Sequence, residues 1–173
     1  MILVAPGPLV AYRMHTPKWA SAPTSGVGAA THGGRANRPG IAALYLILEP
    51  ETAVREYRQL SPLMPPGTLV SYQVEVKPVA DFRGGYAAEQ WSPLWEDFYC
   101  DWRQLWFDDR VEPPSWVLGD EVLAAGGKGL FFGSVHAPEG TNLVLYLDQL
   151  TQDDTLSVYD PDRSLPRNLD SWR

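Results

Sequence analysis

The sequence contains a single cysteine, Cys100, among its 173 residues, so no disulfide can form within the chain. Basic residues are also scarce: 14 lysines and arginines stand against 21 aspartates and glutamates, a net charge of −7. Nucleic acids and anionic lipids bind basic faces, so we expect neither as a direct partner. No apolar run approaches bilayer-spanning length, and the N-terminal residues lack the basic region of a signal peptide. A cytoplasmic protein is expected.

Several motifs that mark common enzyme classes are missing as well. No spacing of cysteines and histidines suits a zinc site, and no HExxH motif is present. The chain has neither a GxxxxGK[S/T] phosphate loop nor a GxGxxG turn that opens a dinucleotide-binding helix. We therefore expect no bound metal and no retained redox cofactor.

The composition is that of a globular domain, with 45% hydrophobic and 20% charged residues, and the length suits one core. Most of the 16 prolines lie between periodic segments, which indicates rigid surface connections. Hydrophobic periodicity then predicts the regular elements. Expected strands cover residues 8–14, 41–48, 69–76, 129–135, 142–147 and 155–159; expected helices cover 50–60, 92–108 and 116–125, and 21–34 is expected to form a loop.

The most informative part of the chain is the segment 33–57. A glycine-rich loop carrying Arg35 leads into an apolar strand with Tyr45, and an acid-rich helix with Glu56 begins at Pro50. A planar guanidinium can hold a phosphate or carboxylate through two parallel hydrogen bonds. A carboxylate can stabilise the positive charge that develops on a sugar during cleavage of its C–N bond. The combination predicts an anionic nucleotide substrate.

The order of these pieces carries a family resemblance. The chain contains, in sequence, Gly33-Gly34-Arg35, Pro39-Gly40, an apolar run with Tyr45, Thr52-Ala53-x-x-Glu56, Phe131-Phe132-Gly133-Ser134 and Asn142-Leu-Val-Leu-Tyr146. From about Arg13 to Asp148 it resembles the RES domain family. Members of that family look like ADP-ribosyltransferases in fold and are toxins of bacterial toxin–antitoxin pairs. Several degrade NAD by hydrolysis or phosphorolysis, and at least one modifies a protein.

The resemblance implies a single α+β domain with a split, mostly antiparallel sheet and flanking helices. Residues 1–160 would form the catalytic domain and residues 161–173 a polar C-terminal tail. The implied function is that of an NAD glycohydrolase or NAD phosphorylase, a toxin that cleaves the nicotinamide N-glycosidic bond and arrests growth. NAD is then a substrate, with water or phosphate as acceptor, and an Xre-type or related antitoxin is the partner protein. Two alternatives remain open: a protein ADP-ribosyltransferase and a non-catalytic partner-binding module.

The resemblance also assigns roles to three residues of the central segment. Arg35 would hold the pyrophosphate or nearby ribose of NAD, whereas the ordinary alternative is a loop arginine in a surface ion pair. Tyr45 would stack on nicotinamide and offer its hydroxyl to the substrate; the alternative is a core tyrosine. Glu56 would stabilise the oxocarbenium character of the ribose, and its alternative is a solvated glutamate paired with a helix arginine. The Thr52-Ala53-x-x-Glu56 spacing selects Glu56 over Glu49 and Glu51.

Ser134 and Arg13 complete the predicted site. Ser134 would orient Glu56 or touch the nicotinamide ribose, and it is not expected to be a nucleophile because no GxSxG elbow surrounds it. Arg13 matches an early family arginine and would be a second phosphate contact, with a structural ion pair as the alternative. His15, His32 and His136 are weaker candidates.

Two features depart from the family pattern. Ala36 stands where the family commonly has an aromatic residue, and the insert from Asp81 to Glu112 is unusually rich in tryptophan. The insert contains an aromatic stripe at helical spacing, which is most often core. It is also the part of the chain in which partner surfaces are expected to differ from those of the family.

Overall fold

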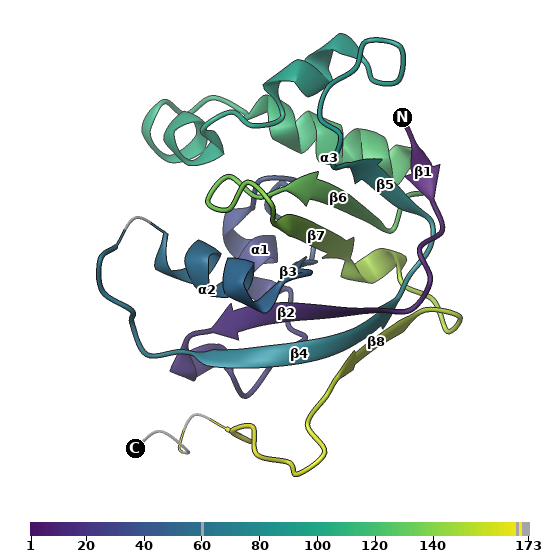
Figure 1. Cartoon of the computed structure of the whole chain (residues 1–173). Helices are drawn as coiled ribbons and strands as arrows, with labels where there is room; N and C mark the ends of the chain where they lie inside the picture. The colour runs from purple at the N-terminus through teal and green to yellow at the C-terminus, as the bar shows by residue number, and fades with distance from the viewer. Residues whose placement is uncertain (60, 169, 171–173) are drawn as a thin grey trace.

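One mixed sheet of eight strands organises the chain in this computed structural model, which describes residues 1–59, 61–168 and 170. The strand order is β1-β5-β6-β7-β3-β2-β4-β8 (Figure 1). All neighbouring pairs are antiparallel except β5 and β6. The strands are β1 (Leu3–Val4), β2 (Leu9–His15), β3 (Ala43–Ile47), β4 (Thr68–Glu75), β5 (Val79–Phe82), β6 (Gly129–Gly133), β7 (Thr141–Tyr146) and β8 (Thr155–Val158). The expected α+β fold with a mostly antiparallel sheet is confirmed.

The sheet is split at its centre. Strands β2 and β3 share a single registered pair, Tyr12 with Ile47, whereas β3 and β7 pair along five residues from Ala43 to Ile47. One half therefore consists of β2, β4 and β8, and the other of β3, β7, β6, β5 and β1. Because the two halves meet at one point, they diverge on either side of it, as Figure 1 shows for β2 and β7.

Strand β4 illustrates how the sequence pattern sets which face is buried. Val70, Tyr72 and Val74 are buried, while Leu69 and Gln73, on the other face of the strand, are exposed, as period-two alternation predicts. The buried residues join a cluster with Leu44 and Leu46 of β3 and Leu143 and Leu145 of β7 on one side of the sheet. This cluster supports the strands from the side opposite the helices that carry functional residues.

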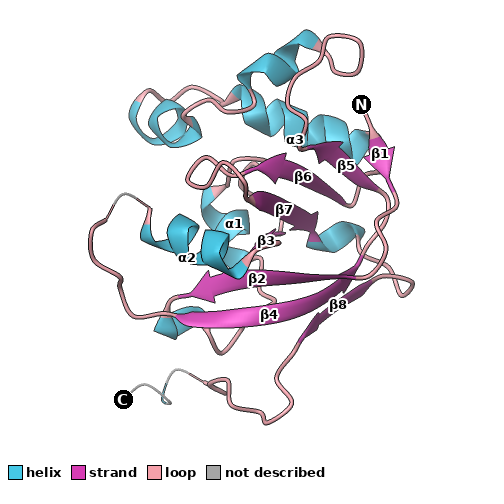
Figure 2. Cartoon of the chain, in the orientation of Figure 1, coloured by secondary structure: helices cyan, strands magenta, loops and turns pink. Residues whose placement is uncertain are grey.

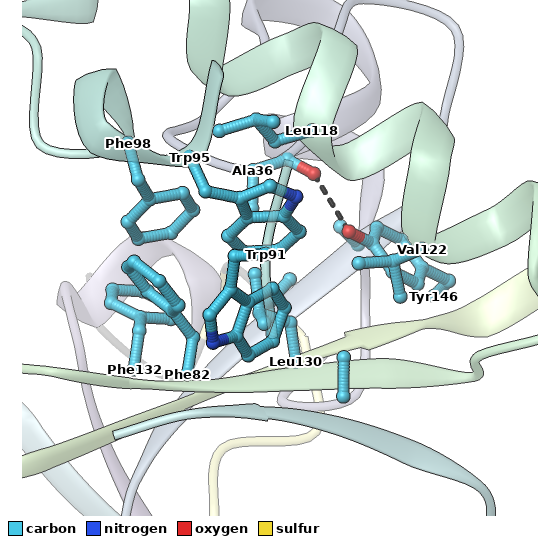
Figure 3. Packing of buried hydrophobic residues seen from close by; sticks show 13 residues of the cluster. Ala36, Phe82, Trp91, Trp95, Phe98, Leu118, Val122, Leu130, Phe132 and Tyr146 are labelled. Atoms are coloured by element: carbon cyan, nitrogen blue, oxygen red, sulfur yellow. Dashed lines mark hydrogen bonds between the residues drawn. The ribbon is translucent and has the colours of Figure 1, made fainter. Parts of the chain in front are cut away.

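Three α-helices accompany the sheet: α1 (Val27–His32), α2 (Pro50–Arg58) and α3 (Pro114–Ala124). α2 packs on β2 and β3, while α3 packs on β6 (Figure 1). Between α3 and the sheet lies a second, aromatic cluster, in which Phe82, Trp91, Trp95 and Phe98 interlock with ring centroids 4.3 to 5.7 Å apart (Figure 3). Its burial anchors the segment between β5 and α3 to the sheet.

The long helix expected at 92–108 was the main wrong prediction of secondary structure. The segment forms a 3₁₀ helix at Pro93–Asp97, a separate short turn, and a π-helical turn at Gln104–Asp108 (Figure 2). Trp95 and Phe98, three residues apart, stack at an interplanar angle of 15°, and three residues per turn is the 3₁₀ repeat. Packing of these rings therefore overrides the helical periodicity.

Smaller differences lie elsewhere in the chain. Residues 21–34 contain α1 and are not loop throughout, and the short strands β1 and β5 were not expected. The helix expected at 50–60 ends at Arg58, with Leu60 outside the described residues. Of the polar tail predicted at 161–173, residues 169 and 171–173 likewise lie outside them, while Leu165 packs against the cluster that contains Leu44. None of the helices among the described residues has the length and apolarity to cross a membrane.

Candidate functional site

A cavity of about 530 Å³ opens beside the point where the two halves of the sheet meet. Its wall is built from β2, α1, the loop after α1, β3, α2, the segment 102–107, β6, the loop after β6, and β7. Four of the five predicted site residues line it: Arg13, Arg35, Tyr45 and Glu56. The structure thus brings together side chains from β2, the loop after α1, β3 and α2.

Ser134, the fifth predicted residue, stands behind Glu56 and outside the lining. Its Oγ lies 2.5 Å from Oε1 of Glu56 and accepts hydrogen bonds from the backbone N–H groups of His136 and Ala137. Because both amides can only donate, the hydroxyl proton of Ser134 is directed to the carboxylate. Ser134 therefore fixes the orientation of Glu56.

Glu56 has two further polar neighbours. Nδ2 of Asn142 donates to Oε1 at 3.3 Å, and Nε2 of His136 lies 3.8 Å from Oε2. Among the described residues no arginine pairs with this carboxylate, which rules out the ordinary helix ion pair. One oxygen is thus held by two donors, and the other faces only the His136 side of the cavity.

The helix that carries Glu56 is tied to β7 and to the loop before it. Oε2 of Glu49 accepts the backbone N–H of Thr141 at 2.8 Å. A Cβ placed on Gly140 would lie 2.4 Å from the side chain of Thr52, so only glycine permits this close approach. These contacts hold the start of α2 against the β6–β7 connection and bring Glu56 within reach of Ser134.

Arg35 is a partly buried cation without a carboxylate partner. Its Nη1 donates to the carbonyl oxygens of Phe98, at 3.1 Å, and Cys100, at 2.9 Å, and its Cζ lies 5.7 Å from the ring centroid of Tyr99. No acidic side chain lies within ion-pair distance in the described part of the chain. Burial lowers the pKa of the guanidinium from its ordinary value. An anionic ligand would restore charge balance at this position.

The loop that carries Arg35 is held by neutral hydrogen bonds. The hydroxyl of Tyr45 accepts the N–H of Ala36 at 2.9 Å and donates to Oδ1 of Asn37 at 2.7 Å. From the other side, Nε1 of Trp116 donates to the carbonyl of Gly34 at 2.6 Å. The loop therefore engages the tyrosine hydroxyl as both donor and acceptor. Tyr45 also lines the cavity, and its role toward the substrate stays a prediction.

Ala36 is completely buried where the family commonly has an aromatic side chain. Its carbonyl accepts the hydroxyl of Tyr146 at 2.9 Å (Figure 3) and approaches α3 so closely that a Cβ on Gly119 would lie 2.2 Å from the oxygen. The loop therefore lies against α3 with no room for a ring. An alanine here is the structural consequence of the aromatic cluster that α3 covers.

Arg13 and Arg103 add two more cations to the cavity wall. Burial lowers the pKa of Arg13, and within the described residues its guanidinium has neither a hydrogen-bond nor an ion-pair partner. Within that part of the chain, the alternative of a structural ion pair finds no support. Among the described residues, three arginines and one acidic residue, Glu56, line this cavity in a protein of net charge −7. This local reversal of charge favours an anionic ligand.

The histidines separate into two groups. His15 is buried away from the cavity, with Nε2 2.6 Å from the hydroxyl of Tyr72, which donates to the carbonyl of Pro23. Burial, and then the charge of Arg13, lower the pKa of His15 to about 4. His32 and His136 line the cavity.

Two lining residues were missed by reasoning from sequence. Asn142 belongs to a segment that carries the family resemblance, but nothing in its residue type pointed to Glu56. Arg103 lies in the tryptophan-rich insert, whose irregular helical turns had been predicted as one regular helix. Only the tertiary structure shows that these two residues line the cavity.

Comparison with known proteins identifies relatives of this fold. The family model described as the RES domain matches residues 10–168. A chain in the crystal structure of the M. tuberculosis MbcT–MbcA toxin–antitoxin complex superimposes with a TM-score of 0.62 at 18% sequence identity, covering 91% of this chain and 85% of that chain. No curated protein sequence matches this chain. Among the described residues no group of three or more acidic, histidine or cysteine side chains is arranged to hold a metal ion.

Proposed function

The chain belongs to the RES domain family, and we propose that it is the toxin of a toxin–antitoxin pair, acting by consuming NAD. One observation carries the proposal: Glu56, oriented by Ser134, shares a cavity with the unpaired guanidinium groups of Arg13 and Arg35. The cations suit the diphosphate of NAD and the carboxylate suits the ribose next to nicotinamide. NAD is a substrate in this proposal, and no retained cofactor is required.

The chemistry follows from the charge that develops on the ribose. As the C–N bond lengthens, its electron pair leaves with nicotinamide, which departs neutral, and the ribose gains oxocarbenium character. Glu56 stabilises that charge, and Ser134 and Asn142 keep one carboxylate oxygen in place. Water or phosphate then bonds to the ribose carbon and releases a proton, giving ADP-ribose or ADP-ribose 1-phosphate. The enzyme is thus an NAD glycohydrolase or NAD phosphorylase.

An antitoxin is the expected protein partner. The structural relative was crystallised as a toxin–antitoxin complex, and by analogy an Xre-type or related antitoxin would cover the cavity here. Exposed apolar side chains at the cavity, Phe107 at 40% and Val135 at 58% exposure, suit such a cover. The same side chains suit docking of a target protein, so transfer of ADP-ribose to a protein is the second candidate.

Incubation of the purified protein with NAD, with and without phosphate, tests the proposal. We expect release of nicotinamide, with ADP-ribose as the second product in water and ADP-ribose 1-phosphate if phosphate is the acceptor. Glu56→Ala should abolish release, whereas Glu51→Ala, an exposed glutamate on the same helix, should retain it. If the wild-type protein releases no nicotinamide in either buffer, NAD degradation is wrong, and labelled NAD with cell extract then tests protein modification.

A further inference from the structure

We propose that Arg103 is a substrate-binding residue that acts with Arg35 as a two-guanidinium subsite for a diphosphate. This inference rests on the proposed function, since it names the part of the substrate that the two arginines hold. Arg35 comes from the glycine-rich loop and Arg103 from the tryptophan-rich insert. The subsite therefore joins a family motif to the segment in which this chain departs from the family.

The side chain of Arg103 is held in a geometry that leaves its donors available. Its Cζ lies 4.6 Å from the ring centroid of Trp102, which is itself 7% exposed. A guanidinium stacked on an aromatic face is restrained in its plane, while the N–H groups along its edge still point outward. Both residues line the cavity. The fork of Arg103 is exposed and therefore accessible to a planar or tetrahedral anion.

The two arginines belong to one structural unit. Arg35 donates to the carbonyl oxygens of Phe98 and Cys100, so the loop and the insert are joined within a few residues of Arg103. Both guanidinium groups line the same cavity. Burial is the largest cause that lowers the pKa of Arg35, and the positive charge of Arg103 is the smallest. Two like charges that line one cavity favour an anion between them. A diphosphate supplies two adjacent charges and matches two guanidinium groups.

Acidic residues lie close to Arg103 in the sequence, but none of the described ones pairs with it. Four aspartates lie within six residues of Arg103 in sequence, at positions 97, 101, 108 and 109. None of the described carboxylates lies within ion-pair distance of its guanidinium, and Asp101 instead accepts the backbone N–H of Gln104 at 3.1 Å. The described acids therefore do not neutralise the charge of Arg103, whose exposed side chain lines the cavity.

Binding of ADP and AMP to the purified protein, measured by titration calorimetry, tests the subsite without requiring catalysis. We expect ADP to bind more tightly than AMP, and Arg103→Gln to weaken ADP binding roughly tenfold with a smaller effect on AMP. Arg103→Lys should recover only part of the loss, because lysine keeps the charge but not the stacked fork. Arg55→Gln removes an exposed charge from α2 outside the cavity and should bind ADP as the wild type does.

Unchanged ADP affinity in Arg103→Gln, with a melting temperature equal to that of the wild type, would overturn the inference. So would the absence of ADP binding to the wild-type protein. In an active enzyme, Arg103→Gln should raise KM for NAD about tenfold and leave kcat nearly unchanged, since the diphosphate lies away from the bond that breaks. If ADP binds through Arg103 but no nicotinamide is released, the subsite stands and the proposed reaction fails.

Discussion

The hydroxyl of Ser134 donates to the carboxylate of Glu56 across 2.5 Å, although 78 residues separate the two in sequence. The bond joins α2 to the connection between β6 and β7, and so it forms only when these two segments are correctly placed relative to each other. It makes Ser134 a positioning residue for the carboxylate that is proposed to stabilise the ribose cation. Loss of this hydrogen bond should therefore change kcat for NAD cleavage without unfolding the protein.

Ser134→Ala should lower kcat roughly tenfold to a hundredfold and leave KM for NAD nearly unchanged, because a hydrogen bond to a charged group contributes about 1.5–3 kcal/mol. Steady-state nicotinamide release checks this split. In the Glu56→Ala background the same substitution should cost nothing further, since the serine acts through the glutamate. Additive losses in the double variant would show an independent role for Ser134.

Arg35→Lys should reduce kcat/KM by at least about tenfold, because lysine cannot hold the Phe98 and Cys100 carbonyls and still present a planar fork to an anion. Stability should also fall slightly as these carbonyls lose their donor. Kinetics and thermal melting on the same preparation separate the two effects. Arg167→Lys, at an exposed position, is the matched control. Retention of full activity by Arg35→Lys would contradict the role assigned to the guanidinium.

Tyr45→Phe should destabilise the protein by about 1–3 kcal/mol, because the N–H of Ala36 and Oδ1 of Asn37 lose the same partner. Urea denaturation provides the free energy of unfolding. Tyr159→Phe, at a side chain that is 63% exposed, should change it by less than about 0.5 kcal/mol. A Tyr45→Phe variant that is as stable as the wild type but inactive would show that the hydroxyl acts on the substrate and does not stabilise the loop.

Gly119→Ala should be strongly destabilising, by about 1–3 kcal/mol or more, because the new methyl group would meet the backbone carbonyl of Ala36 at 2.2 Å. The loop that carries Arg35 must shift, so activity should fall with stability. Gly84→Ala, where a Cβ meets nothing within 4 Å, is the control for a glycine substitution. Equal melting temperatures for the two variants would show that the loop carrying Arg35 can move away from α3 without lowering the stability of the protein.

The free energy of unfolding should decrease as the pH falls from about 6.5 towards 4. The pKa of His15 is lowered to about 4 by burial in the folded state, so the unfolded chain binds the proton more readily across this interval. The stabilisation is complete above the pKa of His15 in the unfolded chain. It is lost, by up to about 3 kcal/mol, as the pH falls through the pKa of His15 in the folded protein. Urea titrations at several pH values should show a shallower loss in His15→Gln. Parallel curves for the two proteins would show that His15 does not contribute.

Local patterns were sufficient for the elements whose burial follows a simple period. The alternation in β4, the buried runs of β3 and β7, the proline-initiated helix α2 and the helix α3 were confirmed within a few residues. The insert was not predictable in this way, because Trp95 and Phe98 pack on rings from other elements and impose a three-residue repeat on their own segment. Tertiary contacts outweighed local propensity there.

The sequence by itself indicated the family, through the order of Arg35, Tyr45, Glu56 and Ser134, and side-chain type limited what each of these residues can do. Only the tertiary structure decided how they act together. Hydrogen bonding directs Tyr45 to the loop and Ser134 to Glu56, and Arg13 lines the cavity with no ion-pair partner among the described residues. These relationships depend on distances between segments far apart in the chain, and residue type and local periodicity contain no information about such distances.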